Sequence, residues 1–98
     1  MEIITNKEIL LRVIKKDGYA LRFASSELKN DKEVVLEAIK KDGEFLQYAS
    51  EELKDDKEIV LEAVKRYCFS FQYASKRLRN DDDVFSEFIK RRNIILQA

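Results

Sequence analysis

The sequence has no proline and no histidine, only one cysteine, and only two glycines among 98 residues. The absence of histidine removes the commonest general base and the commonest metal ligand. Because Cys68 is alone, an internal disulfide is excluded, and the composition is compatible with a reducing compartment. Without proline, helices must be ended by glycine and by capping side chains. We therefore expect a helical protein that is not an enzyme and binds neither a cofactor nor a metal.

Long apolar runs are also missing. No stretch of about 18 apolar residues could span a membrane, and residues 1–8 have neither the basic start nor the apolar core of a signal peptide. The apolar residues (45% of the chain) are regularly spaced among 39% charged residues, which disfavours disorder. We expect one domain, residues 1–98, located in the cytoplasm.

A 25-residue repeat fills the chain. Full copies occupy residues 6–30, 31–55 and 56–80 without insertions, and a partial copy occupies 81–98. Tandem repeats of this length are typical of solenoids. We predict an all-α fold, a short helical-repeat solenoid of helix-turn-helix units, whose handedness the pattern leaves open.

Each copy begins with a pattern that predicts a helix start. A cap-forming residue is followed three positions later by an acid, as in a capping box; the four pairs are Thr5/Glu8, Asn30/Glu33, Asp55/Glu58 and Asn80/Asp83. The first helix of each copy should therefore start just after these caps.

Glycine predicts the end of the first helix in two copies. Gly18 and Gly43 suit the left-handed conformation that follows a helix end. Asn93 is the next-best residue for that position in the fourth copy, whereas Cys68 in the third has no such tolerance. We expect the turn around Cys68 to be built differently or to be strained.

The second half of each copy, residues 44–54 in the second, reads most simply as a continuous amphipathic helix. A break at Ser50 is the alternative, because serine competes for backbone hydrogen bonds. The fourth copy differs: Ser86 replaces Leu11, Leu36 and Leu61, as in a terminal repeat. Phe85 and Phe88 are expected to fill space near the core.

Apolar residues at both ends lack a neighbouring repeat: Ile3, Ile4 and Ile9 at one end, and Phe85, Phe88 and Ile94–Ile95–Leu96 at the other. Large exposed apolar patches favour association. We expect a monomer in dilute solution that forms a weak end-to-end dimer when concentrated.

Several stretches resemble one known repeat: NDKEVVLEAIKKDG (30–43), FLQYASEEL (45–53), DDKEIVLEAV (55–64), LRFASSEL (21–28) and FQYASKRL (71–78). They resemble the repeat of the family catalogued as domain of unknown function 4116. The resemblance covers nearly the whole chain and departs at Tyr67–Cys68 and in the last copy. It implies tandem helical units, often attached to larger proteins, and it implies no activity.

Basic residues near the helix ends form the most function-like pattern. They predict a stripe along the stack, consisting of Lys40, Lys41, Lys65, Arg66, Lys76, Arg79, Lys90 and Arg91. Such arrays contact nucleic-acid phosphates, but cations in a last helical turn also complement the helix dipole. With zero net charge, we favour the structural interpretation.

Phe23, Tyr48 and Tyr73 recur at one position and could line a peptide groove, although core packing is the commoner role. We expect a protein–protein interaction or scaffold module whose partner is an unidentified protein. The first alternative is nucleic-acid or phosphate binding along the basic stripe, and the second is a structural unit that self-associates.

Overall fold

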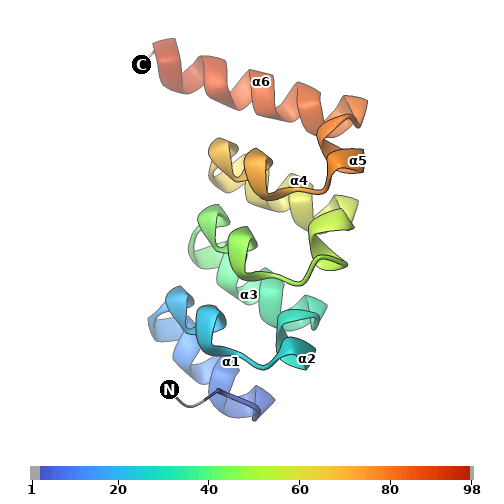
Figure 1. Cartoon of the computed structure of the whole chain (residues 1–98). Helices are drawn as coiled ribbons and strands as arrows, with labels where there is room; N and C mark the ends of the chain where they lie inside the picture. The colour runs from blue at the N-terminus through green and yellow to red at the C-terminus, as the bar shows by residue number, and fades with distance from the viewer. Residues whose placement is uncertain (1–2, 98) are drawn as a thin grey trace.

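A computed structural model describes residues 3–97, apart from the side chains of Ile95 and Gln97. Within these residues the chain is mostly helical and forms no β-strand, so the all-α prediction is confirmed. Four longer helices lie one above another in chain order along the 41 Å axis of the molecule (Figure 1). They are α1 (Lys7–Lys16), α3 (Lys32–Lys41), α4 (Lys57–Arg66) and α6 (Asp82–Gln97).

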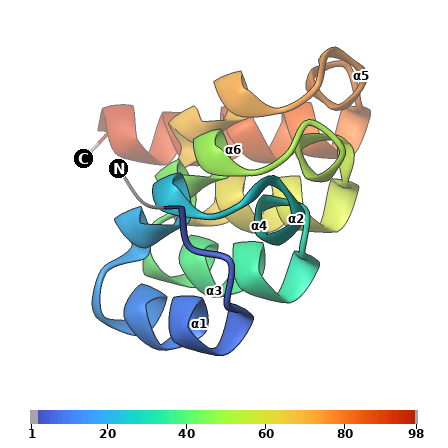
Figure 2. The same cartoon turned by 60° about the horizontal axis from the view of Figure 1, so that its bottom comes forward.

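Short segments connect the longer helices and form a second layer beside them (Figure 2). The connection contains a six-residue 3-10 helix in each of the first three copies: η1 (Gly18–Phe23), η2 (Gly43–Tyr48) and η4 (Cys68–Tyr73). A tight turn follows, formed by α2 (Ser26–Lys29), η3 (Leu53–Asp55) or α5 (Lys76–Arg79). The predicted continuous second helix is therefore wrong, and with it the simple helix-turn-helix unit; the alternative, a break at Ser50, is confirmed.

The break follows from the Ala-Ser dipeptide. Ala24, Ala49 and Ala74 are extended, with ψ of 154°, 161° and 157°. The next serine then caps the following turn: Ser50 Oγ accepts a hydrogen bond from Leu53 N at 3.1 Å. We call residues 24–28, 49–53 and 74–78 the corner segments. Their serines use the short-range bonding that competes with a helix.

The longer helices start one residue later than predicted. Asn6, Asp31 and Asp56 are their caps, and Asp31 Oδ1 accepts a hydrogen bond from Val34 N at 3.2 Å. The capping-box assignment is therefore wrong, because the acids such as Glu33 stand at the second helical position.

Three of the four misassigned acids, Glu33, Glu58 and Asp83, belong instead to a lysine ladder between copies, formed by Lys7, Lys32 and Lys57. Lys7 Nζ lies 2.9 Å from Asp31 Oδ2 and 2.8 Å from Glu33 Oε1. Lys32 and Lys57 repeat this contact with the next copy. These hydrogen bonds raise the pKa of all three lysines.

Neither Gly18 nor Gly43 has a positive φ, so the expected left-handed conformation is wrong. The two glycines instead allow close packing of neighbouring atoms. A Cβ on Gly43 would lie 2.3 Å from the Ala63 carbonyl oxygen. Cys68 begins η4 as Gly18 and Gly43 begin η1 and η2, and it also has no positive φ. The predicted strain is therefore wrong. The difference at this turn is that Tyr67 lacks the side-chain cap that Asp17 and Asp42 provide.

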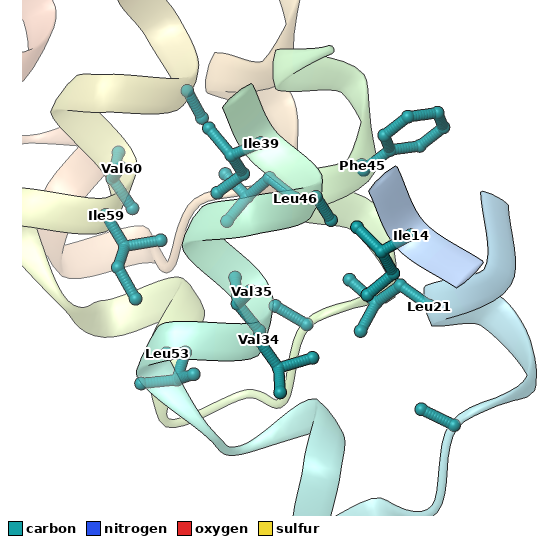
Figure 3. Packing of buried hydrophobic residues seen from close by; sticks show 14 of the residues in the cluster. Ile14, Leu21, Val34, Val35, Ile39, Phe45, Leu46, Leu53, Ile59 and Val60 are labelled. Carbon is teal, nitrogen blue, oxygen red and sulfur yellow. The ribbon is translucent and has the colours of Figure 1, made fainter. Parts of the chain in front are cut away.

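The core runs along the stack. The apolar positions of α3, Val34, Val35, Leu36, Ala38 and Ile39, cover a wide arc that predicts neighbours on more than one side, and α3 is covered on several sides. Val34, Val35 and Ile39 are fully buried. Figure 3 places them between Ile14 and Leu21 of the first copy and Ile59 and Val60 of the third. Burial of this kind is the main stabilising contribution in the stack.

The fourth copy does not turn back. Asn93, which the sequence suggested as a helix end, lies inside α6. Arg92–Asn93 replaces the Asp-Gly dipeptide of the first two copies, and the continued helix gives the N–H groups of these residues intrahelical partners. As a result Phe85 is 49% exposed, whereas Val60 at the equivalent position is fully buried. Phe85 therefore does not fill space near the core as predicted, whereas Phe88 does pack against the core.

Candidate functional site

The eight predicted basic residues fall into two groups. Six lie on the C-terminal turns of α3 and α4 and at the matching point of α6: Lys40, Lys41, Lys65, Arg66, Lys90 and Arg91. Lys76 and Arg79 lie on α5, immediately before α6 begins (Figure 1). Lys90 lies eight residues beyond Asp82, the first residue of α6, so about 12 Å of helix separates it from the end of α5. The structure does not bring all eight together in one stripe.

Three cations of the larger group are paired within their own helices. Lys40 Nζ lies 3.4 Å from Glu37 Oε1, and Arg66 Nε lies 3.0 Å from Glu62 Oε1. Arg91 Nε donates to Glu87 Oε1 at 2.9 Å, which lowers the pKa of that carboxyl. These contacts favour the structural interpretation of the pattern. In the described part of the chain the other five form no ion pair, among them Lys65 and Lys90.

The recurring aromatics belong to the edge of the core. Phe23, Tyr48 and Tyr73 are half-buried. Tyr48 stacks near Phe45, with ring centroids 6.4 Å apart, and burial raises the pKa of Tyr73. These contacts do not form the peptide-binding groove that the sequence suggested along the three aromatic residues.

Chemistry-bearing clusters are absent from the described residues. None of their His, Cys, Asp and Glu side chains gather in threes that could hold a metal ion. Cys68 is 2% exposed and therefore poorly placed to react. Between residues 3 and 97, no helix is long and apolar enough to cross a membrane.

A pocket of about 280 Å³ opens at the start of α6, which we call the α6 pocket. It is lined by Arg79, Asn80, Asp82 and Phe85. The Phe85 ring packs edge-on against Phe71, with centroids 6.0 Å apart. An apolar wall thus faces polar groups of both signs, which is the composition of many binding sites.

An apolar face extends from this pocket along α6. At 100° per residue, Phe88, Arg92 and Leu96 lie on the same side of the helix as Phe85, and Ile94 lies on the opposite side. Leu96 is 63% exposed and Ile94 is 55% exposed, as expected for this end of the molecule. The side chain of Ile95 lies outside the described residues. Phe85, Phe88 and Leu96 are the α6 face below.

The family comparison matches almost the whole chain. The model described as Domain of unknown function (DUF4116) matches residues 6–54 and 56–98, so each match spans about two copies of the repeat. The chain belongs to the DUF4116 family. This confirms the resemblance seen in the repeat motifs. No curated protein and no solved structure matches the chain.

The sequence analysis of this DUF4116 chain missed the α6 pocket. The sequence predicts Asn93 as another helix end and Phe85 as filling space near the core. It also places Phe85 among the apolar residues of the last copy that lack a neighbouring repeat, and this was the usable signal.

Proposed function

We propose that this DUF4116 chain is a protein-binding module without catalytic activity, built as a short solenoid of 25-residue repeats. The observation that carries the proposal is the α6 face. Phe85 and Leu96 are 49% and 63% exposed, and the half-buried Phe88 lies between them along the helix. The rings of Phe85 and Phe88 lie together, with centroids 6.4 Å apart, and Leu96 follows on the same side of the helix beyond Arg92. Exposed apolar residues interspersed with charged groups, here Arg79, Asp82 and Arg92, are typical of protein interfaces.

The remaining surface supports a binding role over a chemical one. Many of its polar groups are helix caps, ladder pairs or intrahelical pairs, and Cys68 is buried. We propose that the module acts in the cytoplasm, where a lone thiol remains reduced.

Photocrosslinking tests the proposed function. A photoreactive amino acid replaces Phe85 or Leu96, and the crosslinked protein from the source organism is identified, purified and titrated by calorimetry. Phe85→Glu should weaken its binding at least about tenfold, because a charge replaces an apolar contact. Ile94→Glu is the matched control on the opposite side of α6 and should change the affinity less than about twofold. Equal losses in both variants would contradict the proposal.

Nucleic-acid binding is a second candidate, favoured by one observation. Lys15, Lys40, Lys65 and Lys90 recur at 25-residue intervals and form a column at equivalent points of the four longer helices. Because neighbouring acids pair with part of this surface, we expect at most weak micromolar, salt-sensitive binding to single strands. Replacing the column by glutamine should abolish it, whereas Lys76→Gln with Arg79→Gln should not. Tight binding at physiological salt would promote this candidate to first place.

Self-association is the third possibility, and the lysine ladder opposes it. In the first three copies a lysine pairs with the cap and the acid of the next copy, but the equivalent residue of α6 is Asp82. If a second molecule stacked on α6 in the repeat register, Asp82 would face its Asn6 and Glu8. We therefore propose a monomer in dilute solution, with end-to-end pairing only when concentrated.

A further inference from the structure

The repeat itself indicates what fits the α6 pocket. In each inner copy a corner segment joins the end of the preceding copy through a backbone hydrogen bond. Ser50 N donates to the Lys29 carbonyl oxygen at 2.9 Å, and Ser75 N donates to that of Lys54 at 2.9 Å. The serine hydroxyl adds a second bond: Ser75 Oγ donates to Asp55 Oδ1 at 2.6 Å.

The α6 pocket stands at the same place in the fourth copy. Its lining residues, Arg79, Asn80, Asp82 and Phe85, are the counterparts, 25 residues later, of Lys54, Asp55, Lys57 and Val60. In the third copy a corner binds the first two of these counterparts and Val60 is fully buried. In the fourth copy α6 continues as a helix through residues 92–97, where each of the first three copies has already turned into η1, η2 or η4.

We propose that the α6 pocket binds a corner segment supplied by another polypeptide. This deepens the protein-binding function proposed above and rests on it. The segment carries a small residue followed by serine, with leucine three positions later. Its serine N–H donates to the Arg79 carbonyl oxygen, and its hydroxyl donates to Asn80 Oδ1. The leucine takes the role of Leu53 and Leu78, which are 7% and 0% exposed in their corners.

Charge favours an acidic segment. Helix α5 presents Lys76 and Arg79, which form no ion pair among the described residues, whereas its Arg77 pairs with Asp55 and the acid Asp82 lines the other side of the pocket. The second copy offers a close precedent, because Ser50 Oγ donates to Asn30 Oδ1 at 2.6 Å and Glu52 Oε2 accepts from Asn30 Nδ2 at 3.0 Å. Asn80 is the counterpart of Asn30. A segment like residues 42–55, with glutamate two positions after the serine, matches both the amide and the basic helix.

A labelled synthetic peptide with the sequence of residues 42–55 tests the proposal by fluorescence anisotropy against the full chain. We expect saturable binding with a Kd of about 10–100 µM, because the peptide must order on binding. The same peptide with Ser50→Pro lacks both the N–H and the hydroxyl and should bind at least about tenfold more weakly. A peptide with the basic sequence of residues 67–80 should also bind more weakly.

Chain variants locate the site. Phe85→Glu should weaken peptide binding at least about tenfold, whereas Phe69→Glu, which alters an exposed aromatic residue of η4, should not. Grafting residues 42–55 in place of residues 92–98 should fill the pocket from within, raise the melting temperature and abolish peptide binding. A graft that neither stabilises nor blocks would overturn the proposal.

Other outcomes overturn it as well. These are absence of saturable peptide binding up to about 1 mM, equal binding of the Ser50→Pro peptide, or a concentration-dependent dimer blocked by Phe85→Glu, which would make a second copy the occupant. If the peptide fails while a purified partner still binds in a Phe85-dependent manner, the corner chemistry is wrong and the protein-binding function stands.

Discussion

Helices α4 and α6 begin alike and end differently. Both start beside a capping aspartate, and both carry a Glu-Arg pair one turn apart, Glu62/Arg66 and Glu87/Arg91. Only after these arginines do they diverge: the chain turns at Tyr67 in one copy and continues as helix in the other. Val60 is fully buried on α4, against which both η4 and α6 pack, whereas Phe85 on α6 is 49% exposed.

The third copy sharpens this comparison, because its turn forms without an Asp-Gly dipeptide. Tyr67 provides no cap, yet η4 matches η1 and η2 in length. What the third copy shares with the first two is a corner whose leucine, Leu78, is fully buried. The chain therefore turns back in the third copy without the side-chain cap that Asp17 and Asp42 provide in the first two.

The largest expected effect concerns the glycines of the first two copies. Gly43→Ala should lower the free energy of unfolding by about 3 kcal/mol, because its Cβ would meet backbone atoms of Ala63 and Tyr67. Gly18→Ala should cost about 1 kcal/mol, since it meets only the Phe45 ring, which can move. Urea titration compares the two. A Gly43→Ala protein as stable as the parent would contradict the close-packing role of glycine.

The matched change at the third turn should also destabilise. Cys68 is buried without a positive φ, so Cys68→Gly removes buried surface and adds backbone freedom in the unfolded chain. We expect a loss of about 1–2 kcal/mol by urea titration. Stabilisation by this substitution would mean that the Cys68 turn is strained after all.

The next effect compares equivalent positions of α4 and α6. Val60→Ala should destabilise by about 2 kcal/mol, because it leaves a cavity in the core. Phe85→Ala removes a larger side chain yet should cost only about 1 kcal/mol, since half of that side chain is already exposed. A larger loss for Phe85→Ala, measured by the same titration, would mean that a further segment covers this position.

A smaller effect of opposite sign is expected at Ser70. This residue is fully buried, and its hydroxyl has no hydrogen-bond partner in the described residues. Ser70→Ala should therefore stabilise the protein by about 1 kcal/mol. Destabilisation in thermal unfolding would instead indicate a partner, such as a buried water, for the hydroxyl.

The smallest effect is expected from the lysine ladder, whose pairs are solvent-exposed. Replacing Lys7, Lys32 and Lys57 by methionine should lower the melting temperature less than Ser70→Ala raises it, and high salt should remove the difference.

The pH dependence of the ladder has a defined sign. The pKa of Asp81 lies below its ordinary 3.8, through hydrogen bonds first from Val84 N and then from Lys57. The pKa of each ladder lysine lies above 10.5. The ladder contribution should thus be complete between these limits, fade as pH falls below about 3.8 and fade as it rises above about 10.5. A ladder contribution that grows in acid would contradict this assignment.

The sequence predicted the all-α class and the apolar arc of α3 that is buried, because hydrophobic periodicity determines these features. It misplaced the helix caps by one residue, since Asn30–Asp31 and its equivalents offer two competent caps in a row. It missed the 3-10 helices because six residues are too few for periodicity to separate them from an α-helix. The role of Gly43 was hidden because it depends on Ala63, a neighbour in space from the next copy.

The α6 pocket was predicted only in part. The sequence placed Phe85 among the apolar residues that lack a neighbouring repeat, and Phe85 is 49% exposed. No motif indicated that Arg79, Asn80 and Asp82 would line a pocket beside it, because these residues come together only in the folded chain.

Thiol labelling tests the central claim, that position 85 is open while its counterpart is closed. Cys68 provides a buried internal reference. In Phe85→Cys, one thiol should react within about tenfold of the rate of an unstructured peptide, while Cys68 reacts only through unfolding. In Val60→Cys, both thiols should react slowly. If the cysteine at position 85 is as protected as Cys68 in dilute protein, the fourth copy is covered and the account of the α6 pocket is wrong.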